Sequence, residues 1–167
     1  MGQVLIHWTP FKIVEHMGLT EADKALLMTE LFQSVEWVQT DHGTIELSRV
    51  VEQVNARLPR HLHGAVEEIV MGWWRRPLLP MEGMGELVKE LKEQGYKIYL
   101  LSNASVDLRK YFHRIPGSEY FDGLMVSAEE KRIKPQHEIF NALYSRFHLN
   151  PEQCIFIDDS PANIEAA

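Results

Sequence analysis

The sequence predicts an α/β fold in which a parallel sheet carries crossover helices and a helical unit is inserted near the N-terminus. Two observations predict this fold. From Pro80 onward, short apolar runs alternate with amphipathic segments, a pattern typical of parallel strands joined by helices. Between about Pro10 and Pro77, four amphipathic helical patterns follow one another with no strand between them.

The helical patterns have recognisable ends. Thr9 precedes a proline at the first helical position, and Thr20 opens an imperfect capping box that runs to Asp23. Gly18 and Pro59 follow the first and third patterns as stop signals. The expected helices of this half are Pro10–Met17, a segment that begins at Thr20, Thr44–Leu58 and His61–Trp74.

The second half alternates strands and helices. The expected strands are Val4–Ile6 as a first stub, then Lys97–Leu101, Gly123–Val126 and Cys154–Ile157. The expected helices are one through Leu87–Leu91 that closes at Gly95, then Val106–His113 and Pro135–His148. The predicted domains are therefore residues 1–9 and 78–167 as the sheet-containing core and residues 10–77 as the helical unit.

Composition sets broad bounds on function. The chain has 167 residues, is 45% hydrophobic and 25% charged, and carries a net charge of −7, which argues against a general nucleic-acid surface. Its single cysteine, Cys154, forms no intrachain disulfide and fits a reducing compartment. No secretory signal is visible, and no apolar run approaches the roughly 20 residues that cross a bilayer. We therefore expect a cytoplasmic protein.

Polar side chains follow the ends of the predicted strands. Ser102 and Asn103 follow one strand, Asp158 and Asp159 follow another, and Lys134 stands between them in the chain. Because the carboxyl ends of parallel strands meet at one edge of a sheet, we expect these side chains to lie close together. A hydroxyl, a lysine and two carboxylates at one edge are the parts of a site for phosphate and magnesium.

These motifs resemble, in the same order, those of the haloacid dehalogenase superfamily of aspartate-nucleophile hydrolases. The likeness covers nearly the whole chain. It is greatest for the capped branch, subfamily I, near the sugar-phosphate phosphatases of the alpha-glucose 1-phosphate type and the N-terminal phosphatase domain of soluble epoxide hydrolases. The matching segments are Val4-Leu5-Ile6, Ser102-Asn103, Lys134-Pro135 and Asp158-Asp159-Ser160-Pro161-Ala162-Asn163.

The resemblance implies a fold and an activity. The fold is a three-layer, Rossmann-like parallel sheet with an inserted helical cap. The activity is magnesium-dependent hydrolysis of a small phosphomonoester, such as a sugar phosphate, through an aspartyl-phosphate intermediate. Dehalogenation is a second enzymatic option, but it requires no metal and would leave the Asp158–Asp159 pair unexplained.

The resemblance also implies a role for each matching residue. Asp159 corresponds to the acid that binds Mg²⁺, Asp158 to a second ligand or to a partner behind the ligands, and Asn163 to the residue that orients the metal's waters. Ser102, with the backbone N–H of Asn103, would bind a phosphate oxygen. Lys134 would supply fixed positive charge to the phosphate and the nucleophile; Lys131 is the residue most easily confused with it.

The start of the chain departs from the family pattern. The nucleophilic aspartate would lie one residue before Met1, and Gly2 stands where the family has its second aspartate, the usual general acid. We therefore expect a chain truncated at both ends and without phosphatase turnover as it stands. A pseudoenzyme that binds phosphate or a partner is the alternative. No side chain is assigned to protonate the leaving group; a water or a cap residue such as His7 is a candidate.

Aromatic residues suggest where the rest of a substrate lies. Trp8 follows the first motif and is the better candidate for a specificity contact. The run Trp73-Trp74-Arg75-Arg76 could help hold a substrate, but it is interpreted first as packing with a solvated flank. The expected partner is a small-molecule phosphate ester, with no nucleic acid and no membrane. The sequence leaves the oligomeric state open.

Overall fold

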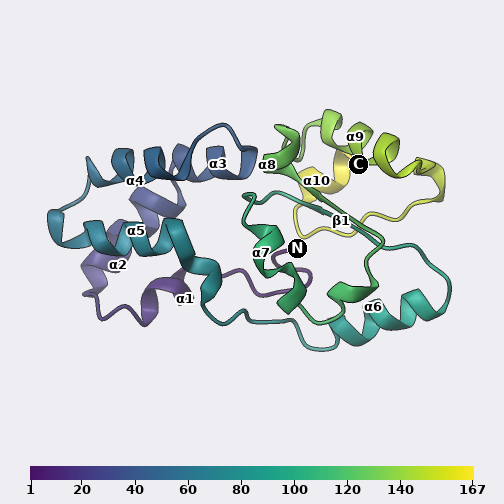
Figure 1. Ribbon diagram of the computed structural model, residues 1–167, viewed down its shortest axis with the longest axis horizontal. Helices are drawn as coiled ribbons and strands as arrows, with labels where there is room; N and C mark the ends of the chain where they lie inside the picture. The colour runs from purple at the N-terminus through teal and green to yellow at the C-terminus, as the bar shows by residue number, and fades with distance from the viewer.

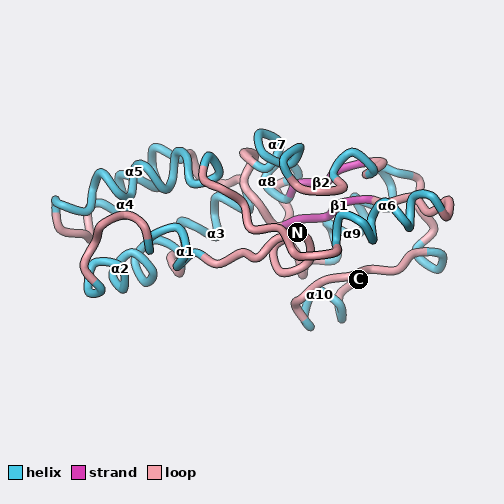
Figure 2. Tube along the Cα trace, turned by 90° about the horizontal axis from the view of Figure 1, so that it is seen from below, coloured by secondary structure: helices cyan, strands magenta, loops and turns pink.

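The computed structural model describes residues 1–167 as two parts arranged along the long axis of the molecule (Figure 1). Residues 10–75 contain helices and turns but no strand, and both strands lie in the second part (Figure 2). The predicted α/β class with a parallel sheet is confirmed. That the helical residues move as a cap over the rest stays a prediction.

The first part contains five α-helices. They are α1 (Pro10–Glu15), α2 (Glu21–Leu27), α3 (Val35–His42), α4 (Leu47–Asn55) and α5 (His63–Gly72). The predicted cap of α2 is confirmed, because the Thr20 hydroxyl accepts a hydrogen bond from the Asp23 amide at 3.1 Å. A π-helical turn, Met28–Phe32, continues α2.

Helix α3 was not among the expected helices. Its ends nevertheless carry ordinary signals: the Ser34 hydroxyl accepts a hydrogen bond from the Trp37 amide at 3.2 Å, and Gly43 ends the helix with φ of 71°. Val35 and Val38 are exposed on this helix, so its sequence lacks a clean apolar stripe and the pattern-based reading passed over it.

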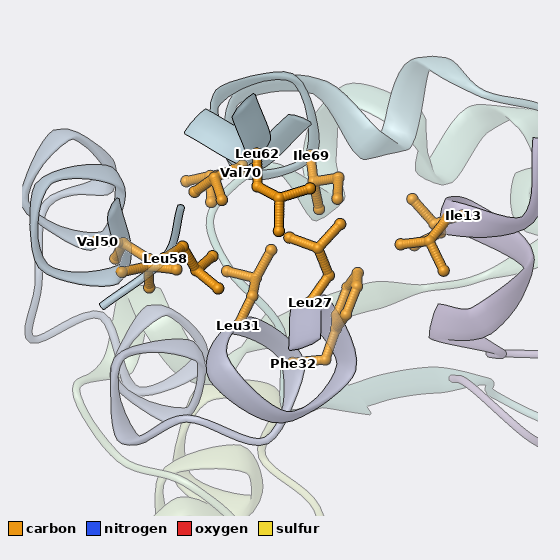
Figure 3. Packing of buried hydrophobic residues seen from close by; sticks show 12 residues of the cluster. Ile13, Leu27, Leu31, Phe32, Val50, Leu58, Leu62, Ile69 and Val70 are labelled. Carbon is orange, nitrogen blue, oxygen red and sulfur yellow. The ribbon is translucent and has the colours of Figure 1, made fainter. Parts of the chain in front are cut away.

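The helices of the first part enclose their own apolar core. Twelve buried residues form one cluster, drawn from α1, α2, the π-helical turn, α4, α5 and the turn before α5 (Figure 3). Leu27, Leu31, Val50, Leu62 and Ile69 are fully buried in it. Burial of this many large side chains stabilises the helices against each other, since none is long enough to be stable alone.

The second part is built on two parallel strands. Strand β1 (Tyr99–Ser102) pairs with β2 (Gly123–Val126) in a register that places Leu101 opposite Met125. Two apolar clusters flank the pair, one with Leu100 and Val126 and the other with Leu101 and Met125. The helices here are α6 (Met84–Glu93), α7 (Leu108–Tyr111), α8 (Ser127–Glu130), α9 (His137–Phe147) and α10 (Pro161–Glu165).

Two of the four expected strands are wrong. Val4–Ile6 forms a turn closed by the Leu5 amide, which donates to the Met1 carbonyl at 2.8 Å, and Ile6 makes only isolated bridges. Cys154–Ile157 is extended but has no ladder of backbone hydrogen bonds, and Cys154 is exposed. An apolar run becomes a strand only where a neighbouring edge accepts its hydrogen bonds, and neither segment has such an edge along its length.

The C-terminal end of α3 contacts α8, which joins the two parts beside the sheet edge (Figure 1). The Ser127 hydroxyl donates to the Asp41 carbonyl, and the Lys131 ammonium donates to the Gly43 carbonyl. His42 Nε2 lies 3.0 Å from the Lys131 carbonyl. These bonds fix one face of α3 above the end of β1. Across the whole chain, no helix combines the length and the apolar composition of a membrane-spanning segment.

Candidate active site

A pocket of about 250 Å³ lies where the two parts meet. It opens at the C-terminal end of β1, the edge at which α/β sheets bind ligands. All the residues that the sequence analysis selected for a site line this pocket: Trp8, Ser102, Asn103, Lys134, Asp158, Asp159 and Asn163. Residues more than 150 positions apart in the chain are thus brought together, although only Ser102 among them ends a strand.

Ser102 is the last residue of β1 and is 3% exposed. Its hydroxyl lines the pocket and makes no hydrogen bond within the protein, so it is free to donate to a ligand. The Asn103 side chain is used differently. Its Nδ2 donates to the Lys134 carbonyl at 2.9 Å and its Oδ1 accepts from the Lys134 amide at 2.8 Å, which fixes the backbone of that lysine.

Lys134 is buried, and its ammonium is held on both sides. Its Nζ donates to the Leu101 carbonyl at 3.1 Å and to the Asp158 carboxylate, and both side chains of the ion pair are 4% exposed. Lys131, the possible alternative, is exposed and donates instead to the Gly43 carbonyl. The geometry therefore makes Lys134 the cation of the pocket.

Asp158 is saturated with donors. One carboxylate oxygen accepts from Lys134, and the other accepts from the Ser160 amide at 3.0 Å and from Asn163 Nδ2 at 2.7 Å. Burial alone would raise the pKa of the Asp158 carboxyl, but the hydrogen bonds from Lys134, Asn163 and Ser160 outweigh burial and lower the pKa below its usual value. Asp158 thus positions Lys134 and Asn163.

Asp159 is the carboxylate left available. It is exposed to the pocket and makes no hydrogen bond or ion pair with other residues. No cluster of three or more acidic, histidine or cysteine side chains exists in the chain to enclose a metal ion. Mg²⁺, however, is commonly held by one or two carboxylates together with waters and substrate phosphate. Asp159 fits that mode of binding, in which a phosphate ligand and waters complete the coordination.

The first residues of the chain form one wall of the pocket. The turn of residues 1–6 places Met1 against the ion pair, where burial and the nearby Lys134 lower the pKa of its α-amino group to about 6, against the opposing effect of Asp158 and Asp159. Gly2 packs so closely on Trp8 that a Cβ at this position would lie 2.8 Å from the Cβ of Trp8. An acidic side chain at position 2 would therefore require Trp8 to move.

Helix α3 adds pocket residues that sequence reasoning missed. Trp37, Thr40 and Asp41 are spaced i, i+3 and i+4, so they share the face of α3 that lines the pocket. Burial raises the pKa of the Asp41 carboxyl to about 7, although the backbone of Ser105 opposes this. The Ser34 cap and Gly43 could have revealed the helix, but no local signal places Asp41 beside residues of β1.

Three indoles form the remaining wall. Trp8 and Trp73 meet edge to face with ring centroids 4.5 Å apart, and Trp8 and Trp37 stack with centroids 6.3 Å apart. Tyr111 continues the cluster, 5.2 Å from Trp73. Trp8, expected from the sequence to be a specificity contact, lines the pocket, and its role in specificity stays a prediction. Trp73, which that analysis assigned to packing, lines the pocket as well, whereas Trp74 does not.

Comparison with known proteins identifies one family of hydrolases. The family model described as haloacid dehalogenase-like hydrolase matches residues 17–167. The sesquiterpene phosphatase astK of Aspergillus oryzae is 29% identical over 171 residues, a match that covers 100% of this chain and 81% of that protein. Flavin mononucleotide hydrolase 1 of Arabidopsis thaliana is 26% identical over 87 residues, or 52% of this chain and 36% of the relative.

Solved structures agree at the level of the fold. A HAD family enzyme from Bacteroides thetaiotaomicron has a TM-score of 0.72 and 23% identity, covering 99% of this chain and 84% of that one. An aspartate-to-alanine mutant of the same enzyme, described as a complex with magnesium and inorganic phosphate, has a TM-score of 0.74 and 22% identity, with 99% and 85% covered. At these identities the similarity supports the shared fold alone.

Proposed function

The chain belongs to the haloacid dehalogenase-like hydrolase family, and we propose that its pocket serves the magnesium-dependent hydrolysis of a small phosphomonoester. The observation that carries the proposal is the convergence of a free hydroxyl, a buried ammonium and a free carboxylate in one pocket at the end of β1. Those residues are Ser102, Lys134 and Asp159. They come from three separate segments, so their meeting is a property of the fold.

The residues divide the work that phosphoryl transfer requires. Lys134 places fixed positive charge against a phosphate oxygen, and Ser102 donates a hydrogen bond to another, so that charge developing on the equatorial oxygens is stabilised. Asp159 would hold Mg²⁺, with Asp158 and Asn163 behind it. When bound, the ion neutralises phosphate charge as a Lewis acid. Asn103 and Asp158 keep Lys134 in place before substrate arrives.

The relatives support phosphate ester hydrolysis in general terms. Two carry names that describe a phosphatase and a flavin mononucleotide hydrolase, and one solved structure of the fold is described as holding magnesium and inorganic phosphate. These names belong to those proteins. A sugar phosphate, expected from the sequence motifs, stays one candidate for the substrate of this chain.

The attacking group is the part of the site that residues 1–167 do not supply. No carboxylate stands beside Lys134 on the side of the pocket formed by Met1 and Gly2. Because Met1 lies against the ion pair, an aspartate directly before it would enter the same space, and we assign the nucleophile to that position. Without it, the pocket would bind and polarise phosphate but not turn it over, which is the pseudoenzyme alternative.

In this proposal the helical residues 10–77 act as a cap. Their separate apolar core makes them a unit, and linkers at His7–Pro10 and Pro77–Gly83 connect them to the sheet-containing part. Trp37 and Asp41 of this unit already line the pocket, so opening of the unit would admit substrate and its return would exclude water from the phosphate.

Three proteins test the proposal: the chain of 167 residues, the chain extended by an apolar strand ending in Asp before Met1, and the same extension ending in Asn. Hydrolysis of an aryl phosphate is measured with magnesium and with a chelator. We expect turnover in the Asp-extended protein alone, lost with chelator and after Asp159→Asn. Chelator-sensitive activity in the unextended chain would contradict our placement of the nucleophile. An inactive Asp extension that folds normally would favour the pseudoenzyme.

A further inference from the structure

The side of the pocket opposite Lys134 is apolar and aromatic. Trp8, Trp37 and Trp73 are each half-buried, so part of every indole faces the cavity rather than the protein interior. Leu47 and Val70 lie beside them on the same wall. We call these five residues the tryptophan wall. It adjoins the phosphate groups within one continuous cavity, so a phosphate held at Ser102 and Lys134 has its ester substituent beside the wall.

The helical part offers this pocket few hydrogen-bonding groups. Besides aliphatic side chains, it contributes Thr40, Asp41 and the indole N–H groups of Trp37 and Trp73, which donate hydrogen bonds but do not accept them. The Thr40 hydroxyl already donates to the Trp37 carbonyl at 2.7 Å, and burial raises the pKa of Asp41 to about 7, so this carboxyl is often uncharged at neutral pH. A sugar carries several hydroxyls that lose hydrogen bonds to water on binding, and one carboxyl with two indole N–H donors cannot replace them all.

We propose that the alcohol portion of the substrate is a compact apolar group, an alkyl or aryl chain, that packs on the tryptophan wall. This inference rests on the proposed phosphatase function and narrows its substrate class. Aromatic side chains supply large apolar contact area in a rigid form, and such walls with a few convergent polar groups at one end are typical of pockets for small amphiphilic ligands. The phosphate supplies the polar end.

Binding to the chain of 167 residues tests this without any turnover. Calorimetry compares four probes in the presence of magnesium: inorganic phosphate, hexylphosphonate, a glucose phosphonate and hexanol. Because each fully buried methylene is worth about fourfold in affinity, hexylphosphonate should bind at least about tenfold more tightly than phosphate. Glucose phosphonate should bind no more tightly than phosphate, since the wall offers its hydroxyls indole donors but no acceptor and cannot replace most of their hydrogen bonds to water.

Two substitutions locate the effect. Trp37→Ala should remove most of the preference for hexylphosphonate and leave the affinity for inorganic phosphate unchanged. Trp74→Ala is the matched control, because Trp74 is half-buried next to Trp73 in the sequence but does not line the pocket, and it should change neither affinity. Thermal melting of both variants verifies folding. If a variant does not fold, the comparison of the four probes on the unsubstituted protein still tests the proposal.

The outcomes separate this inference from the function on which it rests. Equal affinities for hexylphosphonate and glucose phosphonate would contradict the binding of an apolar alcohol portion at the tryptophan wall. Binding of inorganic phosphate would in that case still support the proposed phosphatase function. Binding of hexanol and hexylphosphonate with equal affinity, and no binding of inorganic phosphate, would instead remove the phosphate site and keep the apolar one. If Trp37→Ala leaves the preference for hexylphosphonate unchanged, the hexyl group binds elsewhere on the protein. That result would overturn its assignment to the tryptophan wall.

Discussion

The two sides of the pocket use their polar groups in opposite ways. On the side of β1, Asn103, Lys134, Asp158 and Asn163 hold one another through hydrogen bonds and an ion pair before any ligand arrives. On the side of α3, Asp41 has no side-chain partner, and its neighbours in the pocket are largely apolar. One side is a prearranged charge site; the other is a surface that selects by shape and apolar area.

This difference implies that residues on the α3 side can change without disturbing the charged residues on the β1 side. A network in which each member fixes another tolerates little change, because the loss of one partner leaves a buried charge unpaired. Replacing one indole of the wall with a smaller or larger apolar side chain changes the packing free energy mainly at that position. In our proposal, the cavity therefore combines a tightly constrained phosphate site with a substituent site that is less constrained.

The largest expected effect on stability comes from breaking the buried ion pair on the β1 side of the pocket. Lys134→Ala removes the ammonium from the Asp158 carboxylate, whose side chain is 4% exposed, and leaves that charge buried with only neutral donors. Loss of one partner of a buried ion pair costs about 3–5 kcal/mol. Urea denaturation should show a loss of that order, together with loss of phosphate binding in calorimetry.

Lys131→Ala is the control for this prediction. Lys131 lies three residues away in the same loop, but it is exposed and its side chain makes only the hydrogen bond to the Gly43 carbonyl, so its removal should cost only about 1 kcal/mol. The double variant Lys134→Ala with Asp158→Ala should recover part of the lost stability, because no charge remains buried. Equal stability of the Lys134 and Lys131 variants would contradict the view that the pair is desolvated.

A smaller effect is expected where the two parts of the molecule touch. Gly43 has φ of +71°, and a Cβ there would lie 2.1 Å from the Ala128 carbonyl oxygen of α8. Gly18 has nearly the same φ, +66°, with nothing within 4 Å. Both alanine substitutions carry the left-handed strain of about 1–2 kcal/mol, but Gly43→Ala should cost about 1–3 kcal/mol more because it overpacks the contact.

Denaturant unfolding of Gly43→Ala and Gly18→Ala measures this difference directly. Amide hydrogen exchange adds the location: protection of residues 127–131 should fall in the Gly43 variant and stay unchanged in the Gly18 variant, since the bonds between α3 and α8 lie only at the former. If both variants lose equal stability, the contact between α3 and α8 is looser in solution than the structure has it.

Much of the charged side could be predicted from the sequence. Ser102 and Asp158 follow apolar runs, Lys134 lies between them in an order that resembles a known family, and strand polarity is the basis for expecting them at one edge. In the structure only Ser102 of these residues ends a strand. Their division of labour could not be predicted, because adjacent acids such as Asp158 and Asp159 look alike in sequence. Only the structure shows that the first is saturated with donors and the second is free.

The helical side was far less accessible to prediction. Its α3 lacks an apolar stripe, and the residues that matter there are brought to the pocket by contacts with α8, which are distant in sequence. The errors at Val4–Ile6 and Cys154–Ile157 have a related cause. Apolar composition identifies a segment that can form a strand, but pairing depends on a neighbouring edge that local sequence does not encode.

The smallest expected effect concerns the unpartnered acid on α3. Burial raises the pKa of Asp41 from 3.8 to about 7, so ionising it costs more in the folded chain than in the unfolded one. The wild-type protein should therefore lose stability as pH rises from about 4 to 7, relative to Asp41→Asn, which cannot ionise. At pH 8 the variant should be more stable, by on the order of 2 kcal/mol given partial exposure of the carboxyl; below pH 4 the two should coincide.

Asp122 provides a control of opposite sign on the same protein. Its pKa is lowered by hydrogen bonds from Lys92 at 2.6 Å and from the Ile98 amide at 2.8 Å, so its ionised form stabilises the fold. Asp122→Asn should be less stable than wild type at neutral pH, with the difference vanishing as pH falls through the acidic range. Chemical denaturation from about pH 2 to 8 measures all three proteins. If the difference in unfolding free energy between Asp41→Asn and wild type does not change with pH across that range, the Asp41 carboxyl is solvated. The α3 side of the pocket would then contribute only apolar contacts.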